Sequence, residues 1–116
     1  MALRPGSLVT VSFPVSDLSA IKRRPALVLI VHGEDLIVCG VTSKISRRRD
    51  AIPLDDREMA EGRLPKRSEI RPLKLFTIHR PLVQTLVGRV SDEIFRRVVA
   101  LLVSDLTRGR RPGRST

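Results

Sequence analysis

Six consecutive apolar residues, Ala26 to Val31, constrain the fold of this chain more than any other feature. The run is too short for a buried helix and consists largely of residues that favour strands. Residues 32–35, His-Gly-Glu-Asp, carry a turn signal, and Leu36 to Val41 is a second apolar run. The pattern predicts a hairpin whose first strand is fully buried.

Weaker signals flank this hairpin. Apolar and polar residues alternate over 8–13, which is typical of a half-buried strand. Pro53 restricts a short strand around it to the edge of a sheet, and Gly88 indicates a bulge in a later strand. We therefore expect strands over 8–13, 51–54, 68–71 and 82–90, a loop over 14–25, and a helical turn over 55–61 that Gly62 stops.

The clearest element is an amphipathic helix over 91–106. Ser91 is a favourable N-cap, and Asp92 and Glu93 suit the positive end of the helix dipole. The tail 107–116 contains four Arg and no apolar residue, so we expect it to be disordered. The sequence thus predicts one domain over 1–106, a small, curled, mainly antiparallel barrel of five or six strands with a C-terminal helix.

The charge balance favours a polyanionic partner. The chain has 22 Lys and Arg residues against 12 Asp and Glu residues, a formal net charge of +10. Four of the 22 are Lys, so 18 are Arg, whose planar fork of donors fits phosphate. Nucleic acid, an acidic protein and a membrane surface would each suit this charge. An Arg enrichment that reflects codon usage or solubility is the alternative.

Composition excludes several classes of function. A single cysteine, Cys39, forms no intrachain disulfide, and no Cys/His cluster suggests zinc, so we expect no metal and no cofactor. No apolar run approaches the ~20 residues of a membrane span, and the N-terminus lacks a signal-peptide core, so we expect a cytoplasmic location. The absence of Trp and Tyr argues against RNA recognition by several stacked aromatic rings.

Polar residues gather at one end of the predicted hairpin. Arg24 stands just before the first strand, and Thr42 and Ser43 follow the second. Because hairpin strands are antiparallel, these residues are expected at the same end of the sheet. They form a candidate site; the alternatives are a surface arginine in a cationic run and hydroxyls that cap a turn. His32 and His79 have no patterned carboxylate and are interpreted as surface residues.

Motifs along nearly the whole chain match those of one protein family. They are Ser12-Phe13-Pro14, Asp17-Leu18-Ser19, the stretch from Lys22 to Leu29, Val41-Thr42-Ser43, then Gly62, Leu64, Pro65, Ser68, Arg71, Leu73, Leu75 and Thr77, and finally Gly88-Arg89-Val90-Ser91. In these segments the chain resembles the MazF/PemK/Kid toxins over about residues 5–106.

This resemblance implies an SH3-like barrel that forms a homodimer. It implies a sequence-specific, metal-independent endoribonuclease that cleaves single-stranded RNA through the substrate 2′-hydroxyl, leaving a 2′,3′-cyclic phosphate. It also implies an acidic antitoxin as partner, with operator DNA reached through that antitoxin. Two alternatives stay open. One is a non-catalytic interaction module on the same barrel, an antitoxin-bound regulator or a poison of a protein target like the CcdB relatives. The other is a plain basic RNA-binding protein.

The resemblance also assigns roles by matching position. Arg24 matches the key catalytic arginine and Thr42 its hydroxyl partner. Arg71 matches a second catalytic arginine found in one branch of the family, and a phosphate contact is its alternative role. Asp17 and His79 are candidates for a general base. The residues expected to contact RNA are Lys22, Arg23, Ser43, Lys44, Ser68 and the basic loop Arg47, Arg48 and Arg49, which could instead be a solvated charge run.

Overall fold

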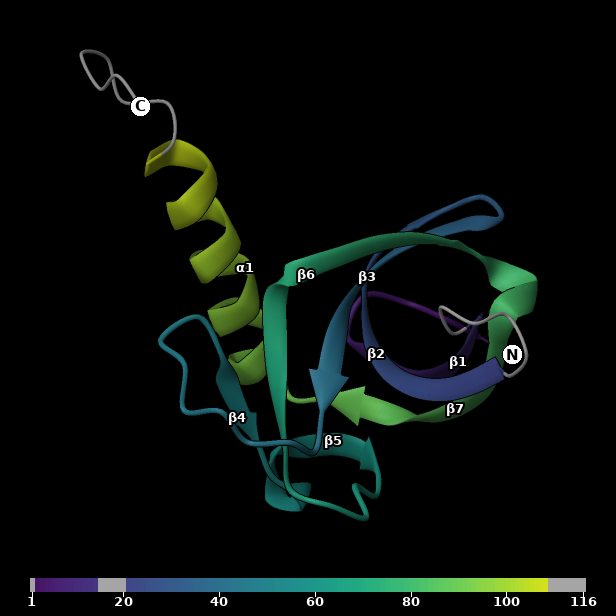
Figure 1. Cartoon of the computed structure of the whole chain (residues 1–116), viewed down its shortest axis with the longest axis horizontal. Coiled ribbons are helices and arrows are strands. Elements are labelled where there is room, and N and C mark those ends of the chain that lie inside the picture. The colour runs from purple at the N-terminus through teal and green to yellow at the C-terminus, as the bar shows by residue number, and fades with distance from the viewer. Residues whose placement is uncertain (1, 15–20, 109–116) are drawn as a thin grey trace.

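The computed structural model describes residues 2–14 and 21–108. This part of the chain forms mainly strands and ends in one long helix (Figure 1). The elements are β1 (Ser7–Pro14), β2 (Ile21–His32), β3 (Asp35–Thr42), β4 (Ile52–Leu54), the 3-10 turn η1 (Asp56–Glu58), β5 (Met59–Gly62), β6 (Ser68–His79), the 3-10 turn η2 (Arg80–Leu82), β7 (Val83–Val90) and α1 (Asp92–Arg108).

The seven strands in the described part of the chain form one antiparallel sheet in the order β4-β6-β3-β2-β1-β7-β5. The predicted hairpin, β2 and β3, lies near the centre of this order, and β4 lies at one edge as Pro53 requires. The sheet curls around an interior, and α1 packs against β6 and β4 (Figure 1). The expected curled antiparallel sheet with a C-terminal helix is confirmed, with more strands than expected.

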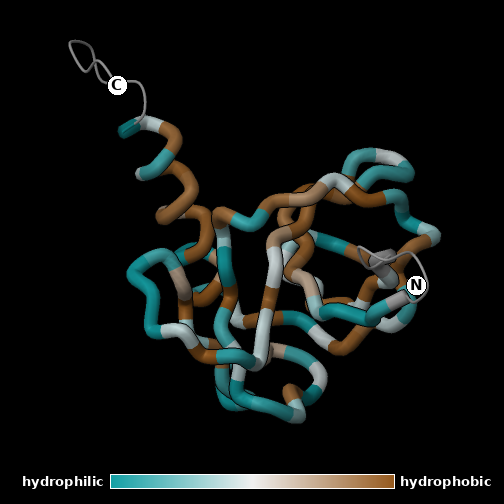
Figure 2. The backbone as a smooth tube through the Cα atoms, viewed as in Figure 1, coloured by the Kyte–Doolittle hydropathy of each residue, from teal (hydrophilic) through white to brown (hydrophobic). Residues whose placement is uncertain are grey.

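Apolar side chains pack on both faces of the central strands, which explains the unbroken apolar run of β2. Figure 2 shows the hydropathy of each described residue along the backbone. Successive residues of a strand point to opposite faces. Leu27 joins a cluster that contains Ile94 and Val98 of α1, whereas Ala26 and Val28 join a second cluster. Both clusters are therefore built from the same strands.

The structure corrects the predicted loop over 14–25. Residues 21–25 belong to β2, because they continue its ladder with β1; Val11 pairs with Arg24 and Ser12 with Arg23. Residues 15–20 of the predicted loop lie outside the described residues. A second correction concerns the strand predicted over 68–71, which extends to His79 because β3 pairs with it along almost its whole length.

The predicted helical turn over 55–61 is also corrected. Only Asp56–Glu58 is helical, and the next four residues form β5 against β7. Gly62 has φ +76, and a Cβ there would lie 2.2 Å from the carbonyl oxygen of Val87. Glycine therefore permits both the turn out of β5 and its close approach to β7.

Helix α1 begins where its sequence signals predict. The backbone N–H of Ile94 donates to Oγ of Ser91 at 3.2 Å, so Ser91 serves as the N-cap. The helix continues two residues beyond the predicted end at 106, and the hydroxyl of Thr107 donates to the carbonyl of Val103 at 2.9 Å. The remaining predicted tail, residues 109–116, lies outside the described residues.

Candidate functional site

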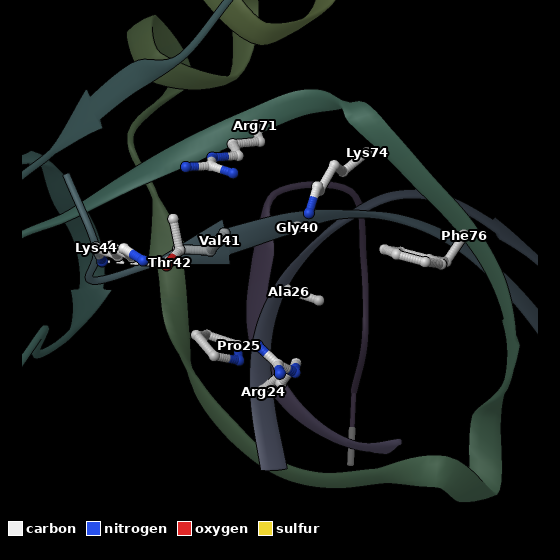
Figure 3. A pocket seen from close by; sticks show the side chains of 10 residues that line it. All are labelled: Arg24, Pro25, Ala26, Gly40, Val41, Thr42, Lys44, Arg71, Lys74 and Phe76. Atoms are coloured by element: carbon white, nitrogen blue, oxygen red, sulfur yellow. Dashed lines mark hydrogen bonds between the residues drawn. The ribbon is translucent and has the colours of Figure 1, made fainter. Parts of the chain in front are cut away.

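Arg24 and Thr42 line one pocket of about 400 Å³ at the end of the β2–β3 hairpin. The antiparallel register pairs Ala26 of β2 with Gly40 of β3. Two residues further toward the open end of the hairpin lie Arg24 on β2 and Thr42 on β3. Figure 3 shows Arg24 on one side of this pocket and Arg71 and Lys74 on the opposite side. The hairpin therefore brings together the two residues that the sequence singled out.

A bulge in β6 opens the pocket. Gly40 of β3 pairs with Arg71, but its neighbour Cys39 pairs with Leu75, so residues 72–74 loop out of the ladder. Pro72 suits this bulge because it has no N–H to donate. Lys74 lies over Gly40, where a built Cβ would stand 3.5 Å from the Lys74 Cβ. The irregularity aims Arg71 and Lys74 into the pocket (Figure 3).

The hydroxyl of Thr42 holds the turn that follows β3. Its Oγ1 accepts a hydrogen bond from the backbone N–H of Lys44 at 3.1 Å. This is the turn-capping role considered above. A hydroxyl that accepts this bond keeps its own proton available, so Thr42 can still donate to a ligand in the pocket. Capping and ligand binding are therefore compatible roles of the same side chain.

Arg24 is exposed, and among the described residues its guanidinium has no hydrogen bond or ion pair. An arginine whose donors are not used by the protein can offer two of them to a phosphate group. Its exposure and its donors, which no other described residue engages, make Arg24 an accessible anion-binding group of the site.

Positive charge surrounds the pocket. Its ionisable lining residues are Arg24, Lys44, Arg71 and Lys74. A second pocket of about 730 Å³ shares Arg24 and Thr42 with the first. It adds three further cations, Lys22, Arg23 and Lys66, and three hydroxyls, those of Thr10, Ser43 and Ser68. No carboxylate lines either pocket within the described part of the chain. The two pockets form one cationic groove on both sides of Arg24 and Thr42, which suits a polyanionic ligand.

Three functional candidates escaped the sequence analysis. Lys74 and Phe76 line the first pocket, and both follow Arg71 on β6. The third is Glu69, which is 3% exposed and pairs with Thr42 in the β3–β6 register. Glu69 precedes Arg71 by two residues and therefore shares its face of the strand. That spacing lay within the predicted strand 68–71 and was the available signal, whereas Lys74 and Phe76 lie beyond the predicted end of that strand.

Comparison with known proteins identifies the family. Residues 4–104 match the PemK-like, MazF-like toxins of type II toxin-antitoxin systems. The chain belongs to this family. No curated protein sequence matches it significantly.

Solved MazF structures share the fold. A MazE-MazF crystal structure from Deinococcus radiodurans superposes with a TM-score of 0.72 at 19% identity, covering 88% of this chain and 94% of the other. A mycobacterial endoribonuclease in complex with its cognate antitoxin gives 0.70 at 14% identity, covering 91% and 96%. The Mycobacterium tuberculosis toxin MazF-mt6 gives 0.67 at 16% identity, covering 87% and 96%.

The basic loop of this MazF-like toxin lies beside the groove. Arg47, with φ 57, and Arg48 line a neighbouring pocket of about 260 Å³, whereas Arg49 lines neither this pocket nor the groove. Arg48 donates to both carboxylate oxygens of Asp50, at 2.9 Å from Nε and 3.0 Å from Nη2. The charge of Arg48 is therefore already partly compensated within the toxin fold.

Of the two candidates for a general base, His79 is not brought to the groove. His79 pairs with Asp35 at the opposite end of β3 from Thr42, and its Nδ1 lies 3.8 Å from the Asp35 carboxylate. Asp17 lies outside the described residues. Across residues 2–14 and 21–108 no three His, Cys, Asp or Glu side chains gather as a metal site. No helix in the same ranges is long and apolar enough to cross a membrane.

Proposed function

We propose that this chain is the toxin of a type II toxin-antitoxin pair and acts as a sequence-specific, metal-independent endoribonuclease on single-stranded RNA. The observation that carries the proposal is the joint position of Arg24 and Thr42 in a groove whose ionisable lining residues are all cations among those described. Membership of the MazF-like family and the endoribonuclease among the structural neighbours support it.

In the proposed reaction the 2′-hydroxyl oxygen of a nucleotide attacks the adjacent phosphorus. A 2′-oxygen–phosphorus bond forms, the bond to the 5′-oxygen breaks, and the products carry a 2′,3′-cyclic phosphate and a 5′-hydroxyl. The phosphorane between them holds extra negative charge. Arg24 donates to its oxygens, Thr42 adds a neutral donor, and Arg71 from the opposite wall takes the remaining charge.

Proton transfer in this scheme does not use the arginines. A guanidinium stays protonated at neutral pH, so Arg24 and Arg71 stabilise charge rather than donate a proton. No His or carboxylate lines the groove within the described residues. We therefore assign the proton of the 2′-hydroxyl to water or a substrate phosphate, and the leaving 5′-oxygen takes a proton from water.

The rest of the RNA is proposed to follow the cationic groove. Phosphates on one side of the cut would meet Lys22, Arg23 and Lys66, and those on the other side Lys44 and Lys74. Ser43 and Ser68 add hydroxyls, and the basic loop extends the positive surface. Contacts of this kind position the RNA and make binding salt-dependent, without selecting bases.

An acidic antitoxin and a second copy of the chain complete the proposal. The groove and the net charge of +10 suit an acidic protein, and structural neighbours include a MazE-MazF complex. On α1, Val99, Val103 and Leu106 leave an apolar stripe exposed at helical spacing. Such a stripe suits burial against another chain. Light scattering after size exclusion is expected to give twice the mass of one chain; a monomeric mass would contradict the dimer.

The deciding experiment incubates a long mixed-sequence RNA with purified protein in EDTA. Wild type is expected to give discrete fragments with cyclic-phosphate ends, and Arg24→Ala none. Arg57→Ala is the matched control, because the Arg57 side chain is 85% exposed and lines none of the described pockets. Intact RNA after incubation with well-folded wild type would overturn the proposal and favour the non-catalytic interaction module.

A further inference from the structure

Glu69 is a buried carboxylate that contacts Arg71 of the candidate site and that the proposed reaction leaves without a role. Its side chain accepts three hydrogen bonds. Oε1 accepts from the backbone N–H of Ser46 at 2.9 Å, and Oε2 accepts from the Ser46 hydroxyl at 2.7 Å and from Nε of Arg71 at 3.2 Å. Both carboxylate oxygens are therefore occupied by donors of the protein.

These donors come from two different segments of the chain. Ser46 follows Thr42 and Lys44 in the segment after β3, and Arg71 belongs to β6. A single carboxylate thus ties the turn that Thr42 starts to the strand that carries Arg71. Loss of this contact would free the segment after β3 and the Arg71 side chain from each other, although the β-ladders would remain.

The contact leaves the functional end of Arg71 free. Only Nε bonds to Glu69, so within the described residues the two terminal nitrogens of Arg71 remain available to a ligand. Its side chain is 20% exposed and lines the pocket. A guanidinium held by Nε keeps its remaining fork of donors in one orientation, which is the preorganisation that charge stabilisation requires.

Glu69 also places a negative charge next to Arg71, one of the cations that line the pocket. An ionised carboxylate accepts hydrogen bonds and donates none, which fits the three donors around it. Its charge partly offsets that of Arg71 and so weakens the attraction for RNA before reaction. Glu69 therefore orients Arg71 but lowers the affinity of the pocket for RNA.

We infer that Glu69 is a positioning residue of the groove, which acts through Arg71 by holding its guanidinium toward the reacting phosphate at some cost in RNA affinity. The inference rests on the proposed ribonuclease function and assigns Glu69 no contact with substrate. It predicts that loss of the carboxylate lowers kcat without raising KM.

The test is a double-mutant cycle of Glu69→Gln and Arg71→Ala, read as kcat and KM for cleavage of a short RNA. A glutamine can accept from the N–H of Ser46 and donate to its hydroxyl, but it then turns an amide N–H₂ toward Arg71. We expect Glu69→Gln to lower kcat about 10- to 100-fold with KM unchanged or lower. In the Arg71→Ala background the same change is expected to have no further effect.

Two further variants keep the test decisive. Arg71→Lys retains the positive charge but has no Nε donor, and it is expected to reproduce the kcat loss of Glu69→Gln even if that variant folds poorly. Glu58→Gln is the matched control, because Glu58 accepts from the backbone N–H of Asp55 at 2.8 Å and lines no part of the groove. It removes a carboxylate with no expected change in kcat or KM.

Additive losses in the cycle would overturn the inference, because they would show that Glu69 does not act through Arg71. A Glu69→Gln variant with the kcat and KM of wild type would overturn it as well. Binding of a DNA oligonucleotide, which has no 2′-hydroxyl, separates this result from the proposed function. If wild type leaves RNA intact, the proposed function fails. In that case, tighter DNA binding by Glu69→Gln only when Arg71 is present would support the inference. Unchanged binding, or the same tightening in the Arg71→Ala background, would overturn it.

Discussion

Gly62 of β5 lies so close to Val87 of β7 that a Cβ on Gly62 would stand 2.2 Å from the carbonyl oxygen of Val87 and 2.8 Å from the Cα of Gly88. Backbone atoms cannot move aside as a flexible side chain can. The φ of +76 at Gly62 adds a conformation that other residues adopt only at a cost. The absence of a side chain at Gly62 therefore allows the end of β5 to lie directly against β7.

Gly62→Ala is expected to destabilise the protein by about 3 kcal/mol or more, from backbone strain and the contact with β7. Urea denaturation followed by circular dichroism measures the change. Gly40→Ala is the matched control, because a Cβ there would meet Lys74 at an ordinary 3.5 Å. Equal stabilities of the two variants would show that β5 does not pack as described.

The reactivity of the Cys39 thiol toward a thiol reagent is expected to measure unfolding. The thiol is fully buried in β3, and burial raises its pKa to about 12. Because the thiolate is the reactive form, we expect no reaction with a thiol reagent at pH 8 in the native protein and complete reaction in denaturant. Time-resolved absorbance measures both rates. Rapid labelling of the native protein would show that β3 opens easily or is not buried.

The stability of the protein is expected to fall on acidification through Glu69. Hydrogen bonds from Ser46, then from Arg71, lower the pKa of Glu69 below its ordinary value of 4.5. Because the folded-state pKa is the lower one, this contribution is complete above pH 4.5 and disappears as the pH falls through the folded-state pKa.

Thermal unfolding between pH 3 and 6 of wild type and Glu69→Gln checks this prediction. The variant is expected to lose less stability over this range. The same measurement on Asp50→Asn is a second test, because the hydrogen bond from Arg48 lowers the pKa of Asp50 as well. If Glu69→Gln followed the wild-type curve throughout, Glu69 would contribute nothing to the acid dependence.

The cations of the groove and of the basic loop are expected to differ in their effect on RNA binding. Lys44 lines the pocket, whereas Arg48 is bound by both oxygens of Asp50. Lys44→Ala is therefore expected to weaken binding and to reduce the slope of log K against log salt concentration by about 1. Arg48→Ala is expected to have a smaller effect. Filter binding at several salt concentrations compares them, and the opposite order would place the RNA on the basic loop.

Local patterns in the sequence were sufficient for the central hairpin and the final helix. The apolar runs at 26–31 and 36–41 have a turn between them, and the helix has its cap at Ser91, so each signal lies within a few neighbouring residues. The hairpin alone also placed Arg24 and Thr42 at one end of the sheet, because antiparallel pairing of adjacent strands leaves no other arrangement.

Long-range pairing decided the rest. Residues 21–25 carry three charges and a proline, yet they are extended because β1 supplies their hydrogen-bond partners. The bulge at 72–74, which aims Arg71 and Lys74 into the pocket, exists only in relation to β3. Glu69 is an ordinary carboxylate in the sequence and becomes the link between the segment after β3 and Arg71 of β6 because folding buries it beside Ser46 and Arg71. Pairing between strands that are distant in the sequence produces no periodic pattern of apolar residues in either strand. These features therefore arise only when the sheet assembles.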